Sequence, residues 1–500
     1  MAPSTNTNEE SVKAYDLTSK ISPFLDLHMI FPLLEYVDSV IIKDHATYES
    51  SAVASSRLSL LTPTNMVDYA MDIYKDLHKT DQIPEEYEAR KEAVFRQLEE
   101  LTVGAADFCH LISDEQTKNK LMVDGEWTLS GLESYGITRE VIDTYKQLAK
   151  FNYECGDYGS SKDMLDIYLS LFLDQTKNNI KTVVVNEETG VEEEEITKKT
   201  EDNIQSIAFN LTSTDGEIHS VLWGKLSCSI LLESWDEAYV NLEDVKRFIE
   251  LRSNNGTLPP LEALQQRTWL LHWSLFVFWN NSKRGLESII ELYTSEKYMQ
   301  AIQTNAPHLI RYLAAAILIN KKKRGGTLKE LVKTLQCCEY EDPIIQFVDA
   351  LYVQFDFDSA QKKLKGCELL LATDFFLCKQ GDLFMEEARV FIFENYCRIH
   401  HKIGIGELST KLAMDENEAE RWIVDLIRNA SLDAKIDAEE GCVIMGNSQQ
   451  ILDNNVYNSL VTKTKDLSTR SAVLGQNLSM IVNEAKKEKD KRNRKNSEDE

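Results

Sequence analysis

The sequence predicts a mainly α-helical protein, in which a solenoid of degenerate helical hairpins, similar to TPR or HEAT repeats, leads into a winged-helix module and a long C-terminal helix. Three observations support this prediction. The 500 residues include only 20 glycines and 9 prolines, about half of the roughly 12% usual for a protein, so turn formers are scarce. Three short segments share one helical-elbow pattern, and residues 402–447 follow the helix and strand order of a winged helix.

The composition excludes several classes of function. Lys and Arg total 55 against 82 Asp and Glu, a formal net charge of -27, so we expect no DNA binding and at most local RNA contact. The nine cysteines form no C-x-x-C pair, which indicates reduced thiols in a cytoplasmic protein rather than a disulfide framework or a zinc module. The longest apolar run, 269–279, is too short to cross a membrane, so we expect a core helix and no membrane partner.

The first half of the chain is expected to hold helical repeats over residues 14–250, after a disordered extension at 1–13. Apolar residues recur at helical spacing from Met66 to Leu77, with Thr64 as the expected N-cap. Residues 174–205 are rich in glutamate and poor in apolar side chains. We therefore expect an acidic mobile insertion within the repeats.

Three segments, 154–161, 232–238 and 354–360, share the elbow pattern. In each, an aromatic residue stands three positions before a small residue, with helical patterns on both sides; the pairs are Tyr158 and Ser161, Trp235 and Ala238, and Phe357 and Ala360. A small residue lets two helices cross closely, and the aromatic fills the turn above it. The pattern predicts stacked hairpins, irregularly spaced, up to about residue 400.

Residues 401–448 are expected to form the winged-helix module. Its second helix, expected at 415–430, carries five acidic residues and two arginines, so it would repel DNA. The strands that follow leave an open sheet edge, to which another chain can add a strand. We expect a partner at this wing edge, on Asp433, Lys435, Asp437, Val443 and Met445.

A C-terminal bundle helix is predicted over residues 452–485, followed by a charged disordered tail at 486–500. Leu460, Leu467, Leu474 and Ile481 recur every seven residues, and Leu478 belongs to the second seam. Because only half of the seam is strongly apolar, the pattern favours a bundle with helices of other chains over a dimer.

No catalytic or metal site is indicated, so we expect no enzyme activity and no cofactor. The adjacent pairs at 400–401 and 337–338 cannot chelate a metal alone, because neighbouring residues on a helix diverge. Gly404 and Gly406 lack the third glycine of a dinucleotide-binding loop. His272 lies in the apolar run and is interpreted as a core histidine rather than a catalytic base.

Two basic segments are candidates for local RNA contact. The first is Lys321, Lys322, Lys323 and Arg324, expected in a loop after an apolar helix, and the second is the tail segment 486–495. Solvated charge is the alternative interpretation of both segments.

Helical repeats that run into a winged helix and a terminal helix resemble the PCI domain, shared by scaffold subunits of the proteasome lid, the signalosome and translation initiation factor 3. Within that group the sequence closely resembles the family of e subunits of eukaryotic translation initiation factor 3, also called Int-6. The blocks of likeness are 15–36, 64–77, 264–279, 351–364 and 419–437. The resemblance implies a PCI domain with a helical part at 251–400 and a winged-helix part at 401–448.

The resemblance also implies a function. The family consists of non-catalytic scaffold subunits in a cytoplasmic complex that binds the small ribosomal subunit and helps to recruit initiator tRNA and mRNA. The implied partners are other PCI and MPN subunits, the small ribosomal subunit and the scaffold protein of the cap-binding complex. Two alternatives stay open, a PCI subunit of the proteasome lid or signalosome and an RNA-binding factor that uses 321–324 and 486–495.

Overall fold

The protein is described here by a computed structural model. The structure describes residues 15–41, 50–80, 82–124, 126–171, 215–281, 284–337, 340–400, 402–406, 409, 420–424, 434–437, 441–445, 460–461, 463–476 and 478–479. The expected extension at 1–13, insertion at 174–205 and tail at 486–500 lie outside these residues. Two compact units divide the chain, Met1–Phe391 and Ile392–Glu500.

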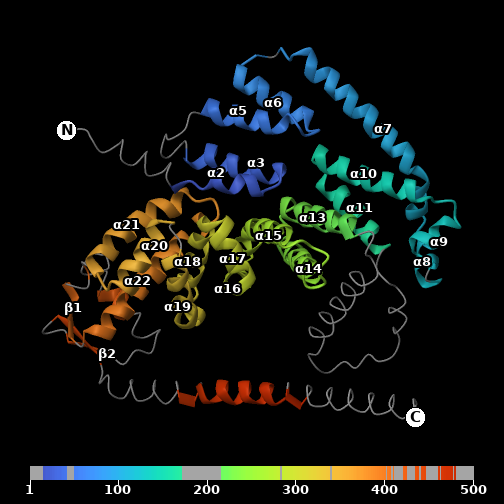
Figure 1. The fold of residues 1–500 in the computed structure, drawn as a ribbon. Coiled ribbons are helices and arrows are strands. Elements are labelled where there is room, and N and C mark those ends of the chain that lie inside the picture. The colour runs from blue at the N-terminus through green and yellow to red at the C-terminus, as the bar shows by residue number, and fades with distance from the viewer. Residues whose placement is uncertain are drawn as a thin grey trace, which may run out of the picture. The chain divides into compact units, whose positions relative to one another are not determined.

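The first unit is helical, as the sequence predicts (Figure 1). Its N-terminal helices are α2 (Thr18–Ile21), α3 (Leu27–Tyr36), α5 (Ser50–Leu61), α6 (Val67–His78), α7 (Glu85–Ser113), α8 (Glu115–Asp124), α9 (Leu129–Glu133), α10 (Arg139–Cys155) and α11 (Tyr158–Ser170). The later helices are α13 (Asp215–Leu231), α14 (Trp235–Asn254), α15 (Pro260–Asn280), α16 (Gly285–Thr294), α17 (Glu296–Asn305), α18 (Ile310–Ile319), α19 (Lys321–Cys337), α20 (Pro343–Val348), α21 (Phe357–Thr373) and α22 (Gly381–Ile399), which ends in the second unit.

Each helix packs against the next from α10 to α17. Helix α18 then packs against α16, α19 and α20, and α20 packs against α21, which agrees with the predicted solenoid of hairpins (Figure 1). The three elbows lie where the pattern places them, and the small residues Ser161, Ala238 and Ala360 are fully buried at the crossings. Because a Cβ or a short hydroxyl is all that fits there, the facing helices approach closely. Ser161 also donates a hydrogen bond of 2.8 Å to the carbonyl of Ala149 on the preceding helix.

The elbows share a backbone feature that the sequence pattern does not reveal. The residue two positions before the aromatic has a positive φ in each, 92° at Gly156, 56° at Glu233 and 56° at Phe355. The next residue donates its N–H back to the preceding helix, over 2.9 Å from Asp157 to Asn152 and 3.0 Å from Ser234 to Ser229. Left-handed residues of this kind end helices and favour glycine, yet only the first elbow has one.

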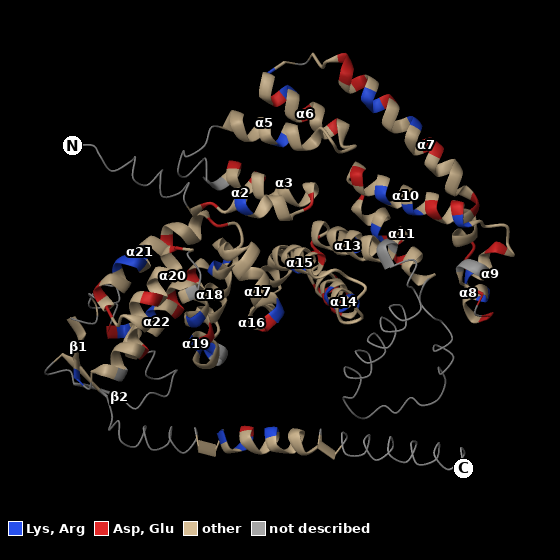
Figure 2. Cartoon of the chain, viewed as in Figure 1, with Lys and Arg blue, Asp and Glu red and all other residues tan. Residues whose placement is uncertain are grey.

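Helix α15 packs against α14, α16 and α17. Residues 270–279 are buried, as predicted for the apolar run, whereas Trp269 is exposed. The start of α7 is charged and exposed (Figure 2), and the buried residues of this helix, Ala105 and Phe108, lie in its second half. None of the helices in the described part of the chain is both long and apolar enough to cross a lipid bilayer.

A buried ion cluster joins distant parts of the first unit. Arg311 on α18 donates to Asp342, to Asp374 at 3.0 Å and to the carbonyl of Tyr15 at 2.7 Å. Tyr312 donates a further hydrogen bond of 3.0 Å to Asp374. A guanidinium is tolerated in a core only with such partners, so Arg311 anchors the N-terminal segment to the later helices.

The expected N-cap of α6 is wrong. The Thr64 hydroxyl donates to the carbonyl of Leu61 at 3.0 Å, at the end of the preceding helix, and Met66 occupies the N-cap position without a side-chain bond. The hydroxyl group thus bonds to a C-terminal carbonyl of α5, which also accepts the Thr64 amide at 3.1 Å, rather than to a free amide of α6.

The second unit holds a three-stranded antiparallel sheet of β1 (Lys402–Gly404), β2 (Ala434–Asp437) and β3 (Cys442–Met445), in the order β1-β3-β2. Residues 405–406, 409 and 420–424 are helical. Ile423 is fully buried, and the neighbouring ring of Trp422 meets Phe393 edge-on at 6.0 Å. The strand and helix order agrees with a winged helix, while the domain boundaries given above remain predictions.

Candidate interaction surfaces

The predicted wing edge is partly wrong, because β3 is the middle strand of the sheet. Val443 pairs with Ile403 on one side and with Ile436 on the other, and its side chain is fully buried. Met445 pairs with Ala434. A strand position that is paired on both sides cannot accept a third neighbour, so Val443 is not an edge residue, while Met445 at the end of the same middle strand stays a prediction.

Strand β2 does lie at an edge of this sheet. It carries Lys435 and Asp437, which pair with Ile444 and Cys442 of β3. The other edge is β1, which includes Lys402. Asp433 lies outside the described residues, so the edge prediction rests on Lys435 and Asp437.

The C-terminal helical residues 460–461, 463–476 and 478–479 are exposed throughout. Among them, Leu467 and Leu474 are 66% and 61% exposed, and Leu460 and Leu478 are each 54% exposed. Leucines at this spacing with so much free apolar surface are typical of a helix that packs against another chain. Ile481, the last residue of the predicted seam, lies outside the described residues.

The basic segment 321–324 is not a loop but the first turn of α19. Arg324 is only 5% exposed and donates to Glu387 at 2.9 Å, and Lys321 pairs with the same carboxylate at 3.0 Å. The expectation of an exposed loop is therefore wrong, because a carboxylate 63 positions away holds Arg324 inside the helical array. The side chains of Lys322 and Lys323 are outside the described set.

The buried histidine of α15 has a satisfied ring, as predicted for a core residue. His272 Nδ1 lies 2.7 Å from the carbonyl of Thr268, and its Nε2 lies 2.9 Å from Nε2 of His308. Burial lowers the pKa of His272 to about 4 and, with the nearby His272 ring, that of His308 to about 3. Among the described residues, no group of three or more His, Cys, Asp or Glu is placed to hold a metal ion.

A polar network that the sequence does not reveal joins α3, α10 and α13. Asp26 is the N-cap of α3, and its Oδ1 accepts from the His28 amide at 3.0 Å and from the Tyr153 hydroxyl at 2.7 Å. The same hydroxyl lies 2.5 Å from Ser227 Oγ. Burial and the Asp26 charge raise the pKa of Tyr153 well above its usual range, so the phenol stays a neutral donor.

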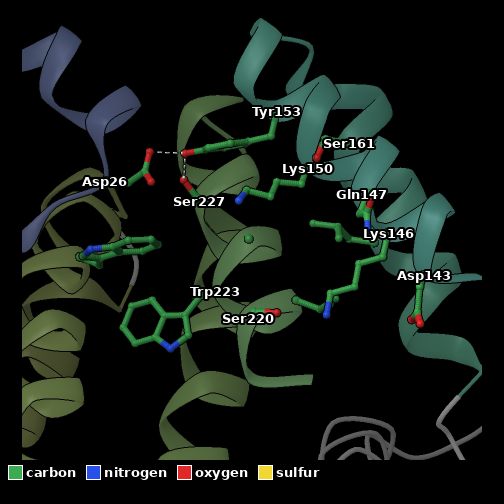
Figure 3. Close-up of a pocket in the computed structure, with 14 residues that line it drawn as sticks. Asp26, Asp143, Lys146, Gln147, Lys150, Tyr153, Ser161, Ser220, Trp223 and Ser227 are labelled. Carbon is green, nitrogen blue, oxygen red and sulfur yellow. Dashed lines mark hydrogen bonds between the residues drawn. The ribbon is translucent and has the colours of Figure 1, made fainter. Parts of the chain in front are cut away.

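This network lies at the wall of a cavity of about 640 Å³ between α10, α11, α13 and α15 (Figure 3). Lys146 and Lys150 reach into it from α10, and Asp26 and Trp223 lie on the opposite side (Figure 3). A second cavity of about 370 Å³ shares Asp26, Trp223 and Trp273 with the first and is also lined by Trp269. The two cavities share this wall, and together they are hereafter called the tryptophan groove.

Comparisons with known proteins give two family matches and a set of similar chains. Residues 16–152 match the family described as eIF3 subunit 6 N terminal domain, and residues 368–447 match the PCI domain. A protein from Arabidopsis thaliana, named as the E subunit of eukaryotic translation initiation factor 3, is 38% identical over 477 residues, covering 93% of this chain and 96% of its own length. Proteins of the same name from Bombyx mori (38% over 472 residues, 93% and 95%) and Aspergillus clavatus (36% over 479 residues, 94% and 94%) are similar over comparable lengths.

Proposed function

Since this chain belongs to the family of E subunits of eukaryotic translation initiation factor 3, we propose that it is a non-catalytic scaffold that joins other subunits through its C-terminal region. Family membership makes it a PCI-domain component of translation initiation factor 3. We further propose that it works in the cytoplasm, within a complex that binds the small ribosomal subunit and promotes recruitment of initiator tRNA and mRNA. Other PCI and MPN subunits and the scaffold protein of the cap-binding complex are the proposed partners.

The observation that supports this proposal most directly is the exposed leucine row of the C-terminal helix. Leu467 and Leu474 keep more than half of their surface free, and burying one leucine stabilises an interface by about 1.5–3 kcal/mol. Two such residues supply about 3–6 kcal/mol, which corresponds to a hundredfold or more in affinity. A helical bundle with neighbouring subunits would bury this row.

The test is the double variant L467E/L474E in the full-length tagged chain. We expect it to lose the other subunits and its co-sedimentation with small ribosomal subunits, because two charges would have to be buried in the bundle. The matched control is T469E/Q476E, which adds the same charge to the opposite face of the same helix and should leave assembly unchanged. Unaltered recovery of the complex with L467E/L474E would refute the bundle.

Strand β2, an edge strand of the sheet in the described part of the chain, is proposed as the second contact, where a neighbouring PCI subunit adds a strand. In the purified complex, a lysine-specific cross-linker should join Lys435 to a neighbouring PCI subunit. Lys402 on the opposite edge provides the internal control and should give no such product. Cross-links at Lys402 and none at Lys435 would assign the contact to β1 instead.

The alternative functions have less support. The relatives share the initiation-factor name rather than that of a proteasome lid or signalosome component. Arg324 cannot contribute to RNA contact through 321–324, because it is buried against Glu387. For Lys322, Lys323 and the tail at 486–495, RNA contact stays a prediction, and it would appear as binding by the purified chain with a steep dependence on salt.

A further inference from the structure

The tryptophan groove has three indole walls at one end. The plane of Trp223 is nearly perpendicular to those of Trp273, at 85° and 4.7 Å, and of Trp269, at 87° and 6.5 Å. The Trp223 and Trp273 N–H groups donate to His219 Nε2 and to the carbonyl of Phe24, each at 3.1 Å, so these two rings are fixed. Trp269 is 41% exposed, unusually open for the largest apolar side chain.

Asp26 supplies a carboxylate beside these rings. Its Oδ1 is held by the hydrogen bonds from His28 and Tyr153, which fix the orientation of the whole group. Figure 3 shows the other oxygen turned away from the bond to Tyr153. The carboxylate is therefore positioned in advance and retains acceptor capacity for a ligand.

The aromatic end of the groove favours a cation. Of the described residues that line the smaller cavity, His219 and Asp26 can carry charge, and burial followed by the nearby Arg252 charge lowers the pKa of His219 to about 4. At neutral pH the lining thus has a single negative charge among electron-rich ring faces, the arrangement that binds guanidinium and ammonium groups. The net charge of -27 on the chain attracts cationic segments further.

The opposite end of the groove has the reverse character. Lys146 and Lys150 stand one helical turn apart on the same face of α10, so both side chains reach the larger cavity. Asp143 also lines this end, and Lys150 has a loose pair with Glu154 at 3.7 Å. Asp26, the second carboxylate that lines the larger cavity, lies on the opposite wall, so the basic groups of this cavity are gathered on its α10 side.

We propose that the tryptophan groove docks an extended segment of a partner protein, with an arginine side chain against Trp269 and Asp26 and an acidic residue near Lys146 and Lys150. Arginine fits better than lysine, because a planar guanidinium stacks on an indole and forms paired hydrogen bonds with a carboxylate. This docking uses neither β2 nor the C-terminal leucines, so it adds a contact in the N-terminal half to those proposed for assembly.

The test uses the purified full-length chain and a displayed library of nine-residue peptides that have one fixed arginine and two fixed glutamates at opposite ends, in both orders. The best binder is synthesised with a fluorescent label and measured by anisotropy. We expect replacement of its arginine by citrulline, an uncharged isostere, to weaken binding about tenfold or more. D26N, which keeps the N-cap acceptor, should weaken binding to the same degree.

The aromatic and basic walls are tested with the same peptide. W269A should weaken binding about 2- to 30-fold, and K146A/K150A should weaken the glutamate-containing peptide but not a version with glutamines. F95A removes an aromatic side chain that is similarly exposed on α7 and should have no effect. The proposal is overturned if no library member binds, if the citrulline peptide binds as well as the parent, or if D26N and W269A match the wild type.

Discussion

The buried pair of His272 and His308 predicts a specific dependence of stability on pH. The Thr268 carbonyl can only accept, so His272 carries its proton on Nδ1, and Nε2 of His308 must donate to Nε2 of His272. Both rings are then neutral in the folded chain. The positive charges of Lys20 and Arg311 act on His308 and disfavour protonation of its ring.

The direction in which stability changes with pH follows from the lowered pKa values. Each histidine has a folded pKa below its unfolded value of about 6.5. At pH values between the folded and the unfolded pKa, the unfolded chain therefore binds more protons than the folded chain. Stability is therefore full above pH 6.5 and is lost as the pH falls toward 4. One pH unit below 6.5, each such histidine has removed about 1.4 kcal/mol from the free energy of unfolding.

The perturbation is H308Q, whose side-chain amide can donate to His272 without titrating. Urea unfolding followed by tryptophan fluorescence at pH 7.5 and 5.5 gives the loss of stability for each chain; the lower pH stays above the sequence pI of about 4.9. The wild type should lose about 1.4 kcal/mol more than H308Q between these pH values. The exposed His78 gives the control H78Q, which should lose as much as the wild type. Equal losses for wild type and H308Q would refute the reasoning.

Two further predictions concern backbone strain and the buried ion cluster. E233G should raise the free energy of unfolding by about 1 kcal/mol, because a left-handed residue with a Cβ is strained, whereas G156A should lower it; equal signs for the two variants in urea unfolding would contradict the shared elbow geometry. R311A should cost about 3–5 kcal/mol, because it leaves Asp342 and Asp374 buried without their partner. Adding D342N and D374N to R311A should restore part of the melting temperature, and an unchanged melting temperature for R311A alone would contradict the role of the cluster.

Local patterns were sufficient to predict the elbows and the core helix α15. An aromatic three residues before a small residue reports a contact between helices that are adjacent in sequence, so Ser161 and Ala238 could be placed without knowledge of the rest of the fold. The apolar run ending at Trp279 likewise predicts a buried core helix, because it is too short to cross a membrane.

Features that depend on distant residues could not be predicted in this way. Arg324 reads as a surface charge until Glu387 is placed beside it, and Tyr153 gives no hint of Asp26, which lies 127 positions earlier. The prediction of the wing edge was partly wrong for the same reason. Chain order does not reveal that β3 lies between β1 and β2.

The bond from Arg311 to the carbonyl of Tyr15 spans 296 positions, and the bond from Trp273 to Phe24 spans 249. A nascent chain emerges at roughly 5–20 residues per second. The first helical segment therefore waits about 15–60 seconds for its partners to be synthesised. During that interval the surface around Phe24 is open to chaperones, so residues in the second half of the chain govern when its first segment becomes native.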